Sequence, residues 1–152
     1  MSRIPDLGDK LELLPDLLAE YENDLKSVEK DLQIEGKRLE VANREQASLQ
    51  NYYDSRKVEL KTLVEFMDLK VKAVQSRLFK SYTESYSVAL SDRAKYTYIE
   101  HEKEYLEKYE LYLEVKEVYE HYVAAVEAFQ ARAYALNNIT KIRVASLEDI
   151  TI

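Results

Sequence analysis

A short stretch of the chain combines positive charges with aromatic residues. Between residues 69 and 83 four basic residues occur without an acidic one, and two tyrosines lie at or just after its end: Lys70, Lys72, Arg77 and Lys80, then Tyr82 and Tyr86. Arg77 and Lys80 are about one helical turn apart, and Lys70 precedes Arg77 by about two turns on the same face. Lysine and arginine neutralise phosphates, while the bases of a single strand stack on aromatic rings. These six residues are therefore candidates for binding single-stranded DNA, although solvent-facing helices often carry a similar density of cations.

A second stretch, from residue 128 to 146, is also basic and free of acidic residues. Its cations are Arg132, Lys141 and Arg143. They can attract an anion such as a phosphate, or they can stabilise the C-terminal end of a helix, where positive charge is favourable. The sequence leaves both interpretations open.

Residue types that catalysis requires are scarce. The chain has no cysteine, which excludes disulfides, thiol nucleophiles and cysteine-ligated metal sites. Its two glycines, Gly8 and Gly36, are too far apart for a phosphate-binding glycine loop. Neither His101 nor His121 has a glutamate three residues before it, so the spacing of a di-iron site is missing. We therefore expect a binding protein rather than an enzyme, with no catalytic residue, metal ligand or cofactor.

The chain is acidic, lacks cysteine and has no stretch that predicts a membrane span or a signal peptide. The net charge is -7, and acidic residues dominate residues 1–35 and 99–121. No apolar run approaches the roughly 20 residues that span a bilayer, and residues 1–30 lack the apolar stretch of a signal peptide. These observations predict a soluble, cytoplasmic protein without a membrane partner.

Apolar residues spaced alternately by three and four predict a first long helix. The row runs from Leu25 to Val74 and passes through Leu39, Tyr53 and Met67, which is coiled-coil spacing. Its start is expected at Pro15 or Asp16, because proline is favoured in the first helical turn. A continuous helix over residues 16–81 would be roughly 100 Å long, so a break near Gly36 or Asn43 that folds it into a hairpin is an equal alternative.

A second long helix is expected to begin after Ser91, whose hydroxyl can cap the first turn. Two apolar rows run along it with a period of seven residues: Tyr98, Tyr105, Tyr112, Tyr119, Val126 and Ala133, and beside them Val115, Tyr122, Phe129 and Leu136. Two rows on one helix require at least two neighbours, and one of these can be a second copy of the chain. The predicted oligomerisation residues are Tyr98, Tyr105, Tyr112, Tyr119, Val126, Phe129 and Leu136.

Two segments are expected to be extended. Residues 82–91 alternate large and small side chains with the period of two that is typical of a loop or short strand. Residues 144–152 are rich in aliphatic and β-branched residues and are predicted to form an extended tail.

The predicted fold is therefore all-α, with long helices in a hairpin or coiled-coil-like arrangement that assembles into a homo-oligomer. We divide the chain into an acidic helical extension (1–35), a helical segment with the basic stretch and the following loop (36–91), and a long C-terminal helix for oligomerisation with its tail (92–152).

Residues 125–143 read AVEAFQARAYALNNITKIR, and this stretch resembles the C-terminal segment of the UvsY-type recombination mediators of tailed bacteriophages. The shared pattern comprises Arg132, Ala133, Tyr134, Ala135, Leu136, Ile139 and Arg143. Upstream, Ile99, Glu102, Glu104, Tyr105 and Leu106 are similar to the start of the family's helix, so the resemblance spans residues 99–143. Arg77 and Leu78 are similar to the pair that closes the family's basic helix, whereas Gln75 stands where the family has a second base. Residues 1–35 have no counterpart.

The resemblance implies a small helical protein that binds single-stranded DNA as a ring of six or seven copies. It also implies a function: the ring helps a RecA-like recombinase to replace the single-strand-binding protein. The partners would be single-stranded DNA, the recombinase, the single-strand-binding protein and the chain itself, as a hexamer or heptamer. If a phage encodes the protein, the compartment is the cytoplasm of the host cell.

A different class of protein is the main alternative. The heptad rows and the acidic surface are also sufficient for a homo-oligomeric coiled-coil scaffold or adaptor that binds no nucleic acid. The acid-free stretches at 69–83 and 128–146 favour the mediator, since a plain scaffold has no evident need for them.

Overall fold

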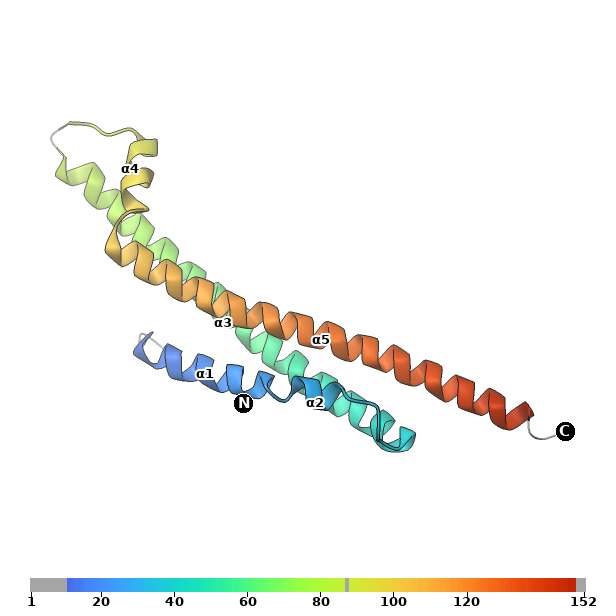
Figure 1. Ribbon diagram of the computed structural model, residues 1–152. Helices are drawn as coiled ribbons and strands as arrows, with labels where there is room; N and C mark the ends of the chain where they lie inside the picture. Colours follow the sequence, from blue (N-terminus) through green and yellow to red (C-terminus); the bar gives the residue numbers. More distant parts are fainter. Residues whose placement is uncertain (1–10, 87, 150–152) are drawn as a thin grey trace. The chain divides into compact units, whose positions relative to one another are not determined.

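The computed structural model describes residues 11–86 and 88–149, so predictions that concern residues 1–10, 87 and 150–152 lie outside it. The described chain is helical between its loops and contains no strand. A short 3-10 turn (Leu11–Leu13) precedes five α-helices (Figure 1): α1 (Leu14–Leu25), α2 (Val28–Leu32), α3 (Leu39–Ser85), α4 (Asp92–Ile99) and α5 (Lys103–Asp149). The predicted all-α fold built on long helices is confirmed.

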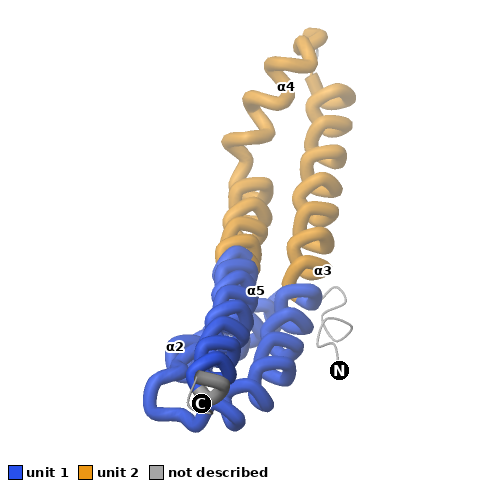
Figure 2. The backbone as a smooth tube through the Cα atoms, turned by 90° about the vertical axis from the view of Figure 1, so that its right-hand side faces the viewer, with its two compact units in different colours: residues 1–59, 120–152 blue, residues 60–119 orange. Residues whose placement is uncertain are grey.

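The chain divides into two compact units, which Figure 2 distinguishes by colour. Unit 1 comprises residues 1–59 and 120–152, and unit 2 comprises residues 60–119. Both α3 and α5 contribute residues to each unit. The units therefore do not coincide with the three consecutive segments 1–35, 36–91 and 92–152, because each long helix continues past the point where one unit ends.

Two of the expected helix signals, Pro15 and Gly36, mark a helix start and a chain reversal in the N-terminal part of unit 1. Helix α1 begins at Leu14 and has Pro15 in its first turn. The chain reverses before α3, where Gly36 has a φ of 77°, in the left-handed region that glycine adopts without strain. Asn43 instead lies inside α3, and its side chain donates to the Leu39 carbonyl over 3.1 Å. The break that the sequence left open between Gly36 and Asn43 is therefore at Gly36.

Aromatic side chains form the core of unit 1 between α1, α3 and α5. The ring of Tyr53 on α3 stacks on Phe129 of α5, with the ring centroids 4.7 Å apart. Tyr21 of α1 meets Tyr122 of α5 edge to face at 5.9 Å, and the Tyr122 hydroxyl donates to the Tyr21 carbonyl over 2.7 Å. Such pairs contribute about 0.5–1.5 kcal/mol beyond the burial of their area. The rings thus fix the positions of α1 and α3 on α5.

A buried arginine on α5 joins three helices of this core. Arg132 is only 4% exposed, and its Nε donates to the carbonyl of Leu32, the last residue of α2 (3.1 Å). Its Nη1 donates to Gln46 Oε1 on α3 (2.6 Å), and Gln46 Nε2 donates to the Phe129 carbonyl (2.7 Å). A helix end leaves carbonyls without a partner inside the helix, and Arg132 supplies a donor for one of them.

Unit 2 has an aliphatic core that continues the same row along α3. Buried residues of α3 (Leu60, Leu63, Met67, Val71 and Val74) accompany Val115 and Val118 of α5 and Ile99 of α4. The predicted spacing of three and four residues is thus confirmed along the part of α3 in unit 2, with one local difference. At Lys70 the predicted row is only half buried, and the neighbouring Val71 takes the core position.

The prediction that residues 82–91 and 144–152 are extended is wrong in part. Helix α3 continues to Ser85, so only residues 86 and 88–91 form an irregular loop among those described. Tyr82 packs against α4, because its ring stacks on Tyr98. This contact favours the helical conformation over the extended one that the period-two pattern predicted. Helix α5 likewise continues to Asp149, as no glycine or proline stops it.

The second long helix is interrupted near its start. The Ser91 hydroxyl accepts from the Ala94 backbone N–H over 3.2 Å, which confirms the predicted cap, but the helix that it caps is the short α4. A turn at residues 100–102 separates α4 from α5. The turn is closed by backbone bonds such as that from the Glu102 N–H to the Ile99 carbonyl (3.0 Å), and no glycine or proline marks it in the sequence.

Candidate nucleic-acid interface

Unit 2 brings cations and aromatic rings together where α3 ends and α4 begins. We call this the α3–α4 surface and define it by five residues: Arg77, Lys80, Tyr82, Tyr86 and Tyr98. The Tyr82 ring stacks on Tyr86 at 5.5 Å and on Tyr98 at 5.8 Å. The outer two rings are about half exposed, with 51% for Tyr86 and 49% for Tyr98. The surface therefore presents a row of three tyrosines beside the last cations of α3.

Three of the four predicted cations of the first basic stretch are exposed, and each of these three pairs with a carboxylate. Lys72 pairs with Asp68, Lys80 lies 3.9 Å from Glu84, and Arg77 pairs with Glu104 of α5. Asp68 and Glu84 stand just outside the acid-free stretch, one turn away along α3, and Glu104 comes from a distant part of the sequence. Exposed ion pairs contribute only about 0–1 kcal/mol each, so another anion can displace these carboxylates.

Lys70 lies apart from this surface. Its Nζ is 5.1 Å from the centre of the Phe66 ring, and the side chain is half buried on α3 beside the core position Val71. Of the six predicted DNA-binding residues, Tyr82 and Tyr86 stack on each other, and Arg77 and Tyr82 bond to Glu104 and Glu102 at the start of α5. Lys80 lies on the last turns of α3 and pairs with Glu84. Lys70 and Lys72 lie further back along α3.

The hydroxyl of Tyr82 is engaged by an acidic residue. It donates to a carboxylate oxygen of Glu102, next to the start of α5. This hydrogen bond, together with burial, raises the pKa of Tyr82 to about 12. Tyr82 therefore stays neutral near pH 7 and presents a ring without charge.

Helix α4 adds residues that sequence reasoning missed. Lys95 is buried with its Nζ 4.7 Å from the centre of the Phe79 ring, and it lies 3.5 Å from Asp92. Phe79 also meets Tyr96 at 5.2 Å, and these two rings line a small pocket of about 170 Å³ with Gln75 and Ser76. Two bases followed by an aromatic residue, Arg93, Lys95 and Tyr96, are the signal after the capping serine that could have identified these residues.

The second basic stretch does not form a single surface. Arg132 is buried in the core of unit 1, where its bonds to Leu32 and Gln46 give it a structural role. Lys141 and Arg143 lie on the last turns of α5, where both are exposed and pair with no carboxylate of the described residues. Only these two cations are accessible to an anion.

The predicted oligomerisation residues separate into two groups. Val126, Phe129 and Leu136 are buried in the core of unit 1, so in this fold they pack helices within the chain. The tyrosines are more accessible. Tyr98 belongs to the α3–α4 surface, and the half-buried Tyr105 and Tyr112 stack on either side of Tyr109, at 5.9 and 5.8 Å. Tyr119 is half buried.

An exposed apolar row lies next to these tyrosines on α5. Leu106, Tyr109 and Leu113 follow the spacing of three and four residues and are 42%, 38% and 43% exposed. This spacing places the three side chains on one helix face, as in the seam of a coiled coil. It is the part of α5 in unit 2 where large apolar side chains are left uncovered by the described chain.

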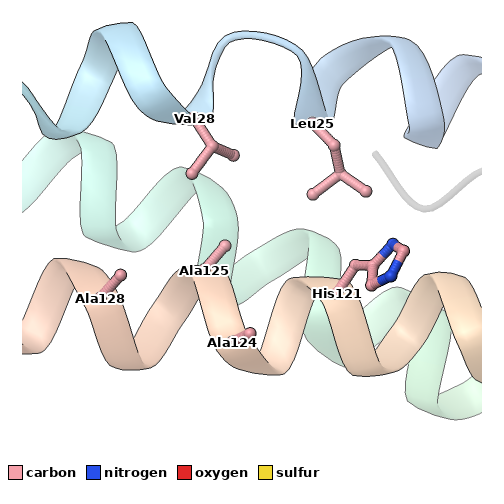
Figure 3. Close-up of a pocket in the computed structure, with 6 residues that line it drawn as sticks. All are labelled: Leu25, Val28, His121, Ala124, Ala125 and Ala128. Carbon is pink, nitrogen blue, oxygen red and sulfur yellow. The ribbon is translucent and has the colours of Figure 1, made fainter.

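An open groove in unit 1 has a mainly apolar lining. Figure 3 shows this groove, where Leu25 and Val28 point toward three alanines of α5 (Ala124, Ala125 and Ala128) beside His121. Its volume is about 350 Å³. The His101 side chain has a hydrogen-bond partner within its own helical region, since its Nδ1 lies 2.7 Å from the Thr97 carbonyl. No group of three acidic, histidine or cysteine side chains able to hold a metal ion occurs in residues 11–86 and 88–149.

None of the described helices, α3 and α5 included, contains a stretch that is both long and apolar enough to cross a bilayer. Comparisons of the chain with protein-family models, with curated proteins and with solved structures found no match.

Proposed function

We propose that this protein binds single-stranded DNA without covalent chemistry, through the α3–α4 surface. The observation that carries the proposal is the row of stacked tyrosines, Tyr86, Tyr82 and Tyr98, at the end of the helix that also carries Arg77 and Lys80. Exposed ring faces stack with bases, and each stacked base contributes about 1–3 kcal/mol. The two cations neutralise phosphates of the same strand.

This arrangement favours a single strand over a duplex. The bases of a duplex are stacked on one another and paired, so their faces are not available to Tyr86 and Tyr98. A single strand can turn its bases toward the rings while its backbone follows Arg77 and Lys80. The surface recognises no particular base, because every base has an aromatic face.

We further propose that several copies act together as a recombination mediator. A homo-oligomer, such as the hexamer or heptamer that the resemblance implies, presents one α3–α4 surface per subunit, so weak contacts add up along one strand. The exposed row Leu106, Tyr109 and Leu113 supports self-association. Bound in this way, the strand would be held ready for a RecA-like recombinase in place of the single-strand-binding protein.

Fluorescence anisotropy of a labelled single-stranded oligonucleotide tests the proposal at several salt concentrations, with a duplex as the comparison. We expect selective binding to the single strand that weakens steeply as salt rises. The variant Arg77→Glu/Lys80→Glu should lose most of this affinity. The variant Arg143→Glu/Lys141→Glu changes the same number and kinds of charges on the end of α5, and should lose much less. Equal losses in both variants would mean that the attraction is general and that the α3–α4 surface is not the site.

A scaffold without nucleic-acid binding is the second candidate. It is favoured by the pairing of Lys72, Lys80 and Arg77 with carboxylates, which already neutralises most of the basic stretch. Absence of binding at low salt, by protein that is folded and self-associated, would establish this alternative over the mediator.

A further inference from the structure

Two glutamates at the start of α5 contact the α3–α4 surface. Glu102 precedes the first residue of α5 and accepts the hydrogen bond of the Tyr82 hydroxyl. Glu104 lies in the first turn of α5 and pairs with the guanidinium of Arg77. One aromatic ring and one cation of the proposed DNA site are therefore each bonded to an acidic group of the same chain.

The backbone holds these two carboxylates in place. The turn at residues 100–102 ends α4 and starts α5, so the chain changes direction beside the last turns of α3. Negative charge in the first turn of a helix is favoured by the helix dipole, which stabilises Glu104 where it is. The Leu106 N–H donates to the Glu102 carbonyl over 3.0 Å and fixes the backbone of Glu102. The backbone of Glu102 and Glu104 is thus fixed within reach of Tyr82 and Arg77.

A carboxylate and a phosphate compete for the same donor. Both present anionic oxygens to the fork of N–H groups on a guanidinium, and arginine binds either one in the same way. Arg77 and Glu104 are each about half exposed, with side-chain exposures of 56% and 50%, so the pair is accessible to an incoming phosphate. Phosphate can bind Arg77 fully only when Glu104 releases it.

We propose that Glu104, assisted by Glu102, is an internal competitor that lowers the affinity of each α3–α4 surface for nucleic acid. The inference rests on the proposed function, because it concerns the same surface. Glu104 occupies Arg77 in the free protein, and Glu102 holds the Tyr82 hydroxyl on the side of α5. A strand must displace one carboxylate and also supply a base that stacks on the tyrosines.

The competitor gives the surface a selectivity that the cations alone would not provide. A free phosphate or a single nucleotide gains too few contacts to repay the loss of the Arg77–Glu104 pair. A longer strand engages the surfaces of several subunits at once, and its contacts add up before any single one is strong. The surface therefore discriminates by strand length and by the presence of accessible bases.

The variant Glu104→Gln tests the proposal, with Glu100→Gln as the matched control. Glu100 lies four residues before Glu104, in the turn between α4 and α5, and is exposed, and neither Arg77 nor Tyr82 is bonded to it. Each variant removes one negative charge, so a general electrostatic gain is common to both. In the anisotropy titration we expect Glu104→Gln to bind the oligonucleotide about two- to fivefold more tightly than Glu100→Gln at low salt, which corresponds to the strength of one exposed ion pair. The difference should shrink as salt rises, because salt screens the competing pair.

The same substitutions in an Arg77→Ala background isolate the competition. Without Arg77 there is no donor to compete for, so Glu104→Gln and Glu100→Gln should then bind alike. If the wild-type protein binds the strand and Glu104→Gln gains no more than Glu100→Gln, the competitor is disproved while the proposed function stands. If neither the wild-type protein nor Glu104→Gln binds at low salt, the proposed function itself fails, and the inference fails with it.

Discussion

The guanidinium of Arg132 on α5 donates to the side-chain oxygen of Gln46 on α3 across 2.6 Å, inside the core of unit 1. The same guanidinium reaches the carbonyl of Leu32 at the end of α2. No carboxylate of the described residues pairs with it, so neutral acceptors from two other helices hold this buried cation. A residue that the sequence suggested for anion binding thus serves to join helices.

Replacing this arginine should destabilise the protein strongly. In Arg132→Met the Leu32 carbonyl and the Gln46 side-chain oxygen lose their donor while they remain covered, and we expect the free energy of unfolding to fall by about 2–4 kcal/mol. Urea unfolding followed by circular dichroism measures this change. The control Arg143→Met removes an exposed arginine from the same helix and should change stability by no more than about 0.5 kcal/mol. Equal effects of the two substitutions would contradict the structural role of Arg132.

Gly36 should be the least replaceable residue of the loop before α3. Its φ of 77° is in the left-handed region, and an added Cβ would meet no atom within 4 Å, so the cost of Gly36→Ala is backbone strain alone. We expect a loss of about 1 kcal/mol, measured by thermal unfolding. Gly36→Asn should lose less, because asparagine tolerates this conformation better than alanine does. A Gly36→Ala protein as stable as the wild type would show that the loop does not need this conformation.

The core tyrosines predict a loss of stability in alkali. Burial raises the pKa of Tyr122, and burial together with the hydrogen bond to Asp31 raises the pKa of Tyr53. A tyrosine in the unfolded chain ionises near pH 10, so these two residues favour folding fully below that pH. Above it the unfolded chain releases its phenolic protons first, and the free energy of unfolding falls as pH rises.

Urea unfolding between pH 8 and pH 11 measures this dependence. The fall in stability should be shallower in Tyr53→Phe, which has no phenolic proton to release at that position. Tyr134→Phe changes a tyrosine that is 72% exposed, and should retain the slope of the wild type. An unchanged slope in Tyr53→Phe would refute the assignment of the alkaline loss to this core residue.

The exposed row on α5 should mediate self-association. The variant Leu106→Glu/Leu113→Glu places two like charges on one helix face, and we expect it to sediment as a smaller species than the wild type in analytical ultracentrifugation. Val58→Glu is the control, since Val58 is an exposed aliphatic residue on α3 in unit 1. If the double variant keeps the mass of the wild-type assembly, copies of the chain do not meet through this row.

The sequence predicted those features that depend on neighbouring residues along the chain. The Ser91 cap and the reversal near Gly36 follow from local backbone chemistry, and the buried row of α3 follows from the helical period. The sequence failed where a distant residue decides the outcome. Tyr82 was expected in an extended segment, but its contacts with Tyr98 and Glu102 keep it helical.

The candidate site was predictable in part, for the same reason. The sequence identified Arg77, Lys80, Tyr82 and Tyr86, which are close together along one helix and its loop. It could not show that Glu104 pairs with Arg77, because the two residues are joined only by the packing of α5 on α3. The sequence also could not distinguish the buried Arg132 from the exposed Lys141 and Arg143, because all three are basic residues.

The way the two units share the chain has a consequence for protein synthesis. Unit 2 is one uninterrupted stretch, residues 60–119, whereas unit 1 combines residues 1–59 with residues 120–152. A ribosome adds about 5–20 residues each second, and contacts between residues close in sequence form before distant ones. Unit 2 can therefore fold while the chain is still growing. The aromatic core of unit 1 can form only after Tyr122 and Phe129 emerge from the ribosome, so Tyr21 and Tyr53 lack these partners until then.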